Sequence, residues 1–196
     1  MGAVVAVKRN ERVYVATDRM RTRMGVRWTL KMEENLKIHR LKDGVIVCVC
    51  GHVESLQNLY VHQNWFKVPK DMEFGKKFLS TKVVPKLIDI LDQKGILERN
   101  DDGLPFMNDL YMIIKDDRIF IIDYDFGVVE AEDIGIIAAD VDDMYMRGYL
   151  DNHEEKDIEK LLQQAYKACS MDKANCSANI VITDTVNEEM RFYGED

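Results

Sequence analysis

The 196-residue sequence has few prolines and cysteines, an excess of acidic over basic residues and no long apolar run. A membrane-spanning helix needs about 18 to 20 apolar residues, and the first residues lack the basic-then-apolar order of a signal peptide. Lys and Arg total 27 against 35 Asp and Glu, for a formal net charge of −8. We therefore expect a cytoplasmic protein that binds neither nucleic acid nor membrane.

The cysteines exclude a disulfide framework and make a metal site improbable. Cys48, Cys50, Cys169 and Cys176 lack the paired spacing of a zinc site, and nothing suggests an oxidising compartment. Cys48 and Cys50 share one face of a strand, where core packing is favoured over metal binding. We expect reduced, packed cysteines, no cofactor and no metal, and histidines (39, 52, 62 and 153) that are structural or solvated.

The hydrophobic content of 46% and charged content of 32% fit one globular domain over residues 1–196. Apolar and β-branched runs predict strands, and apolar residues at three-to-four spacing predict helices. The expected strands are 3–7, 12–17, 36–41, 45–50, 110–115, 119–123 and 134–139, followed by a final hairpin of 177–185 and 189–193. The expected helices are 52–66, 72–91, 142–150 and 154–170, with Pro85 kinking or breaking the second and a loop at 99–105.

Strands come first and last in this order, and the helices are grouped in pairs between them. This does not alternate as a doubly wound fold requires, so the helices must cover sheet faces as layers. The order predicts an α+β fold, a four-layer αββα sandwich.

Four segments resemble the proteasome β-type subunits and their bacterial ring-peptidase relatives, which are N-terminal-nucleophile hydrolases. They are residues 3–22, 37–41, 49–59 and 146–151, the last similar to the family's Ala-x-Gly-x-Leu-Asp helix. Asp18 follows Gly2 by 16 residues and Gly51 follows Lys37 by 14, as in the family. The resemblance covers nearly the whole chain.

The resemblance implies a set of site residues. In the family, a mature N-terminal threonine attacks the scissile carbonyl, a lysine and an aspartate support it, and a glycine amide binds the oxyanion. The matching positions are Gly2, Lys37, Asp18 and Gly51, with Val49 in the substrate pocket and Ser177 as a further site residue. From the residues alone, Asp18 could make a surface ion pair, Lys37 could be solvated, and Gly51 could only end a strand.

Three departures from the family pattern argue against peptidase activity. Gly2 has no hydroxyl or thiol, so the nucleophile position carries no attacking atom. Val141 stands where a Gly-Ser-Gly turn has its serine, and Ala174 stands where a segment that keeps Ser177 has its aspartate. Cys48 and Cys50 sit inside a strand, which disfavours either as a replacement nucleophile.

Three hypotheses follow for the function. The first is a non-catalytic or inactivated subunit of a self-compartmentalised ring protease, with residues such as Trp65, Phe66, Met144 and Tyr145 available for subunit contacts. The second is an active threonine peptidase whose native residue at position 2 differs, acting on peptides or unfolded proteins with a possible ATPase unfoldase as partner. The third is a non-peptide amide hydrolase of the same superfamily.

Overall fold

The first of two facing sheets contains the N-terminal hairpin. The structure is a computed structural model that describes residues 2–23, 26–29, 37–51, 59–138, 142–172, 176–187 and 189–194. Asn10 and Glu11 turn the hairpin with φ of 50° and 60°, the left-handed geometry of a tight turn. Five antiparallel strands lie in the order β12-β1-β2-β13-β14: β12 Ile134–Ala138, β1 Ala3–Arg9, β2 Arg12–Asp18, β13 Ile180–Asp184 and β14 Arg191–Tyr193.

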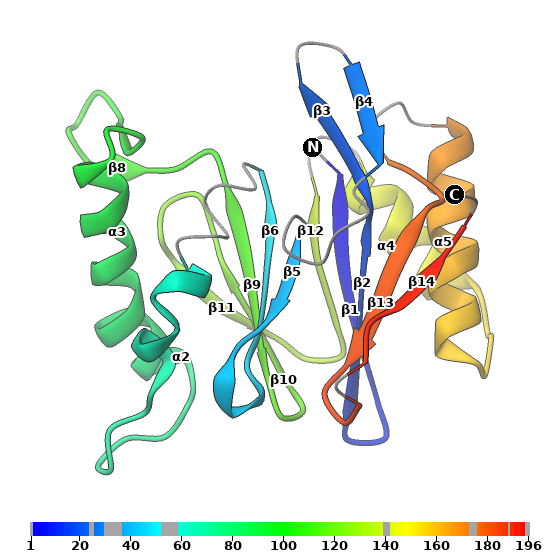
Figure 1. Ribbon diagram of the computed structural model, residues 1–196, viewed down its shortest axis with the longest axis horizontal. Coiled ribbons are helices and arrows are strands. Elements are labelled where there is room, and N and C mark those ends of the chain that lie inside the picture. The colour runs from blue at the N-terminus through cyan, green and yellow to red at the C-terminus, as the bar shows by residue number, and fades with distance from the viewer. Residues whose placement is uncertain are drawn as a thin grey trace.

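The second sheet lies opposite the first (Figure 1). All residues of its strand Ile46–Cys50, which has a neighbouring strand on each side, are buried, which explains why this run is apolar throughout instead of alternating. Asp43 and Gly44, at φ of 64° and 73°, turn the chain into that strand. The order is β11-β10-β9-β6-β5: β11 Val128–Ala131, β10 Arg118–Ile122, β9 Leu110–Lys115, β6 Ile46–Cys50 and β5 Ile38–Arg40.

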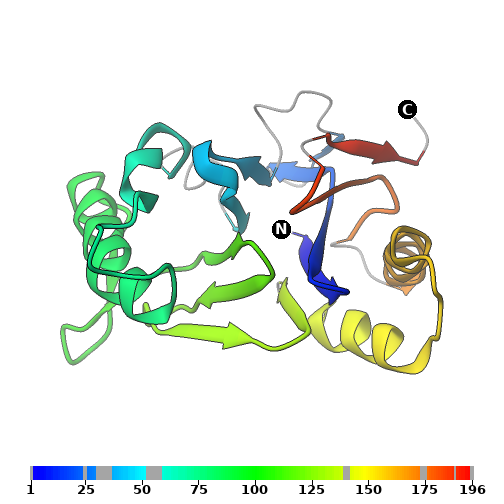
Figure 2. The same ribbon diagram turned by 90° about the horizontal axis from the view of Figure 1, so that it is seen from below.

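Helices cover the outer face of each sheet, which confirms the four-layer αββα sandwich (Figures 1 and 2). Buried apolar side chains form one cluster between the sheets and one between each sheet and its helices. No helix among the described residues is both long and apolar enough to cross a membrane. The first sheet is covered by α4 (Asp142–Asn152) and α5 (Ile158–Asp172), and the second by α2 (Lys76–Phe78), the π-helical turn η4 (Leu79–Val83) and α3 (Val84–Gln93).

The expected break at Pro85 is present as a change of helix winding. The π-helical turn comes immediately before Val84, and Pro85 lies in the first turn of α3, where its missing N–H costs least. This helical segment begins at Lys76, four residues later than expected, and α5 begins at Ile158 instead of residue 154. Of the helix expected at 52–66, residues 52–58 lie outside the described residues; 59–61 are helical and Gln63–Phe66 forms the 3-10 turn η3.

Several short elements were missed from the sequence. The loop expected at 99–105 contains a small hairpin of β7 (Glu98–Arg99) and β8 (Pro105–Phe106). A second hairpin, β3 (Met20–Arg23) and β4 (Val26–Thr29), extends from the end of β2. β11 was also missed. Strands of two to four residues give too few positions to establish a period-two pattern.

A charge network at one end of the sandwich ties the two sheets together. Asp184, at the end of β13, accepts hydrogen bonds at Oδ2 from Arg12 at 2.5 Å and Arg191 at 2.9 Å. Arg40, from β5 of the second sheet, donates to the backbone carbonyls of Asp184 and Asn187. The side chain of Asp184 has no exposed surface. Its carboxylate joins two strands of the first sheet, and its backbone carbonyl accepts the arginine from the second sheet.

Candidate active site

Gly2, Asp18 and Lys37 lie together where the first strands of both sheets begin or end. Gly2 precedes β1, Asp18 ends the neighbouring β2, and Lys37 precedes β5 of the opposite sheet. The Nζ atom of Lys37 is 2.6 Å from Oδ1 of Asp18. The lysine side chain is only 4% exposed and the aspartate is fully buried, so this is an internal ion pair between the sheets and not a surface pair.

The ion pair occupies the space into which a side chain at position 2 would point. A Cβ atom built on Gly2 would lie 2.1 Å from Oδ1 of Asp18 and 2.3 Å from Nζ of Lys37. Carbon atoms in folded proteins do not approach so closely, so any side chain here requires one or both partners to move. Both atoms lie at the ends of side chains, and because both side chains are buried, the packed surroundings limit where they can move.

The electrostatics of the pair are set by burial. Burial raises the pKa of Asp18, and the nearby Lys37 ammonium opposes that shift by charge and by hydrogen bonding. Its second oxygen, Oδ2, is buried without a hydrogen-bond partner among the described residues. Lys37 supplies the largest compensation for the buried carboxylate, and a hydrogen bond from the Met20 backbone adds to it.

Three donors fix the backbone beside Gly2, and sequence reasoning assigned none of them to the site. The thiol of Cys50 donates to the carbonyl of Gly2 at 3.0 Å. The hydroxyl of Thr17 donates to the carbonyl of Ala3 at 3.1 Å, and the hydroxyl of Tyr166 lies 2.8 Å from the same oxygen. Strand alternation could have directed Cys50 toward the first sheet, but nothing in the sequence pairs Tyr166 with Ala3.

Gly51 follows β6 in a conformation suited to glycine, with φ of 147°. A Cβ atom built on it would lie 1.9 Å from Oδ1 of Asp109, a buried residue. Val49, two residues earlier, is fully buried in the core between the second sheet and its helices. Gly51 therefore allows the chain to pass close to Asp109, and Val49 fills the core.

Ser177 makes no described contact with the Gly2 group. Its Oγ accepts a hydrogen bond from the amide of Asn179 at 3.1 Å. The carbonyl of Asn179 in turn accepts from the amide of Arg19 at 2.8 Å, which places this turn beside the end of β2. Val141 and Ala174, at the positions of the other family departures, lie outside the described residues.

The remaining candidate ligands are engaged elsewhere. Cys48 and Cys50 both pack in the core between the sheets, and all four cysteines are buried, with no disulfide among the described residues. His62 stacks on Trp65, and His153 stacks on Tyr149. In the part of the chain that the structure describes, no group of three or more His, Cys, Asp or Glu side chains is arranged to hold a metal ion.

No family model and no curated protein matches this sequence. Solved structures match over most of its length. BPH of Thiobacillus denitrificans, solved in complex with epoxomicin, superposes with a TM-score of 0.72 at 15% identity, covering 93% of this chain and 97% of that one. Anbu of Yersinia bercovieri, an ancestral β-subunit, gives 0.71 at 12% identity with coverage of 99% and 88%.

The chain has the proteasome-like N-terminal-nucleophile hydrolase fold. HslV of Trypanosoma brucei shares it too, with a TM-score of 0.65 at 14% identity and coverage of 93% and 98%. The structural superpositions establish the fold, and sequence identities this low leave the activity open. Within the proteasome-like fold, the structure brings Gly2, Asp18 and Lys37 into contact, whereas Ser177 is engaged in its own turn.

Proposed function

We propose that this chain is a proteasome-like subunit that assembles with copies of itself and has no peptidase chemistry of its own. The observation that supports this most strongly is the filled space at position 2. An N-terminal threonine, serine or cysteine attacks the scissile carbonyl with its side-chain hydroxyl or thiol. Gly2 has neither, and the Lys37–Asp18 pair occupies the volume that such a side chain would need.

In this proposal the remaining site residues have lost the group on which they would act. Lys37 and Asp18 would orient and polarise a nucleophile, and the Gly51 amide would stabilise an oxyanion. When residues act as a unit, loss of the nucleophile removes most of the rate enhancement, whatever else is kept. The pair then serves to join the two sheets beside the start of β1.

Cys50 is a poor substitute nucleophile despite its contact with Gly2. Burial raises the pKa of the Cys50 thiol, and the thiol donates its proton to the Gly2 carbonyl. The thiolate is the attacking form of cysteine. A thiol that stays protonated in a hydrogen bond is a structural donor.

The second candidate function is an active threonine peptidase whose native residue at position 2 is not glycine. The retained, buried Lys37–Asp18 pair favours it, since this pair would support a threonine hydroxyl. Peptides or unfolded proteins would then be the substrates, and an ATPase unfoldase a fitting partner. The Lys37 ammonium would have to move from its present position to admit the threonine side chain.

Turnover of a fluorogenic peptide library by the purified protein and by Gly2→Thr separates the two candidates. We expect neither protein to exceed the rate of a Gly2→Thr/Lys37→Met control, because the added side chain displaces the pair that would have to support it. Turnover by Gly2→Thr well above that control would establish the second candidate.

Sedimentation velocity on the same preparations tests assembly. The expected species is several multiples of the 22.8 kDa chain. A monomer at high protein concentration would contradict the assembly part of the proposal.

A further inference from the structure

His39, in the edge strand β5 of the second sheet, is a buried histidine. Its side chain is only 8% exposed, and its Nε2 atom has no hydrogen-bond partner among the described residues. Buried polar nitrogens in folded proteins are normally paired. This imidazole is therefore held in a place that suits its neutral form and not its charged form.

Tyr60 covers His39 on the side of the helical layer. The register partner of His39 is Val47, which packs in the cluster between the second sheet and its helices. Directly opposed residues on neighbouring strands share a face of the sheet, so His39 faces the helices as well. The ring centroids of Tyr60 and His39 are 5.1 Å apart, with the planes tilted by 35°. Tyr60 is 47% exposed, so its ring lies nearer the surface than the imidazole does.

Residues 59–66, which carry Tyr60, are anchored to the second sheet at their two ends. We call these residues the cover segment. Leu59 and Phe66 are buried in the core under the helices, and the side chains between them are exposed or half-buried. The amide of Lys42 also donates to Oε1 of Gln63 at 3.3 Å. Opening of this segment exposes little of the core, so it costs less than unfolding of the sheet.

No charged group faces His39 from the described elements that pack against it. Its chain neighbours Lys37 and Arg40 are bonded to groups of the first sheet. β6 presents Val47, and the cover segment presents the uncharged ring of Tyr60. Burial is the cause that shifts the pKa of His39, and it lowers that pKa.

We propose that His39 and Tyr60 form a pH-sensitive latch, in which protonation of the imidazole releases the cover segment from β5. An imidazolium carries two N–H donors, and the buried position gives Nε2 no acceptor among the described residues. The tilted Tyr60 ring attracts a cation only weakly compared with water. Release lets water reach the charged ring. The latch belongs to the single chain and does not depend on the proposed assembly.

The direction of the pH response follows from the preference of the closed form for neutral imidazole. The pKa of His39 is lower in the closed form than in the open form, where it is near 6.5. The closed form therefore has its full stability above that value and loses stability as the pH falls through it. While the closed imidazole stays neutral, the opening constant rises about 10-fold between pH 7.5 and 5.5.

Hydrogen exchange measured by mass spectrometry tests the latch. After correction for the intrinsic effect of pH, exchange in the cover segment should accelerate about 10-fold between pH 7.5 and 5.5. Helix α5 serves as the reference in the same sample and should keep its protection. His39→Leu and His39→Gln remove the titrating group, so exchange in the cover segment should no longer depend on pH. Circular dichroism confirms that both variants fold.

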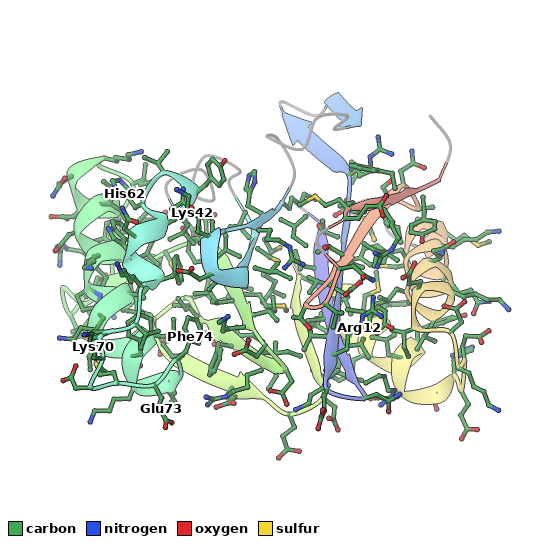
Figure 3. All side chains as sticks on the ribbon, turned by 60° about the horizontal axis from the view of Figure 1, so that its bottom comes forward. Arg12, Lys42, His62, Lys70, Glu73 and Phe74 are labelled. Atoms are coloured by element: carbon green, nitrogen blue, oxygen red, sulfur yellow. The ribbon has the colours of Figure 1, made fainter. Side chains whose placement is uncertain are left out.

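The matched control is His62→Gln, because His62 lies in the cover segment itself. His62 stacks on Trp65 and lies near Lys42 (Figure 3). This variant should keep the full pH response of the parent. The latch is overturned by a parent whose cover segment does not respond to pH, by a response that persists in the His39 variants, or by its loss in His62→Gln. Each of these results leaves the proposed function standing.

Discussion

Replacing Lys37 by methionine should lower the free energy of unfolding by about 3–5 kcal/mol. The substitution leaves Asp18 fully buried without its counter-charge, because Lys37 is the only residue that forms an ion pair with Asp18 among the described residues. Urea unfolding at pH 7, followed by circular dichroism, measures the loss.

The loss should shrink at acid pH. Burial already raises the pKa of Asp18, and removal of the ammonium raises it further. A carboxyl whose pKa is higher in the folded than in the unfolded state favours folding at pH values below its unfolded pKa, which is near 3.9. That contribution to stability is lost as the pH rises through the folded-state pKa. The Lys37→Met variant should therefore approach the parent's stability as the pH falls toward 4.

The matched control is the double variant Asp18→Leu/Lys37→Met. Replacing both members of a buried ion pair by apolar residues of similar size is often neutral or stabilising. We expect the double variant to recover most of the loss caused by Lys37→Met alone. Losses that simply add in the double variant would contradict a direct interaction between the two side chains.

The second large effect is expected for Asp184→Ala, which should destabilise the protein by about 3 kcal/mol. Its carboxylate accepts hydrogen bonds from Arg12 and Arg191, and from the backbone amides of Val186 and Asn187. Removing it leaves two partly buried guanidinium groups without their shared acceptor. Thermal unfolding at pH 7 measures the loss, and Asp184→Asn, which keeps an oxygen for the backbone amides, should cost less.

The Asp184 contribution also has a defined pH dependence. Burial alone would raise the pKa of Asp184, but hydrogen bonds from Arg12, the Asn187 amide and Arg191 outweigh it and hold that pKa well below its usual range. A carboxyl whose pKa is lower in the folded than in the unfolded state stabilises the protein at pH values above its unfolded pKa. That contribution to stability is lost as the pH falls through the folded-state pKa. The stability difference between parent and Asp184→Asn should be complete at pH 7 and decrease below about pH 4. A difference independent of pH would contradict this account of the charge network.

The sequence predicted the framework well where a run of residues was long enough to show a period. Strands β1, β6 and β9 follow apolar runs that a buried strand requires, and Asp43 with Gly44 marks a turn that only a few residue types adopt readily. Helix starts were less well predicted, because Met72 and Phe74 continue the apolar spacing before Lys76 although they lie outside the helix.

The site was only partly predictable. Asp18 and Lys37 were placed together by the resemblance to a family, since no spacing rule connects residues on two different sheets. The contact of Tyr166 with Ala3 joins residues 163 positions apart, and Cys50 reaches Gly2 only because the sheets face each other. Side-chain contacts across layers depend on the packed fold, so local patterns carry no signal for them.

The most direct test of the filled space at position 2 is the stability of Gly2→Ala, which adds only the Cβ atom. We expect it to lower the free energy of unfolding by about 1–3 kcal/mol in urea titration, because the methyl group meets Asp18 and Lys37. Gly148→Ala, in α4 with nothing within 4 Å of the added atom, is the control and should stabilise the protein by about 0.5–1 kcal/mol. A Gly2→Ala protein as stable as the parent, or more stable, would show that position 2 accepts a side chain and would contradict the account.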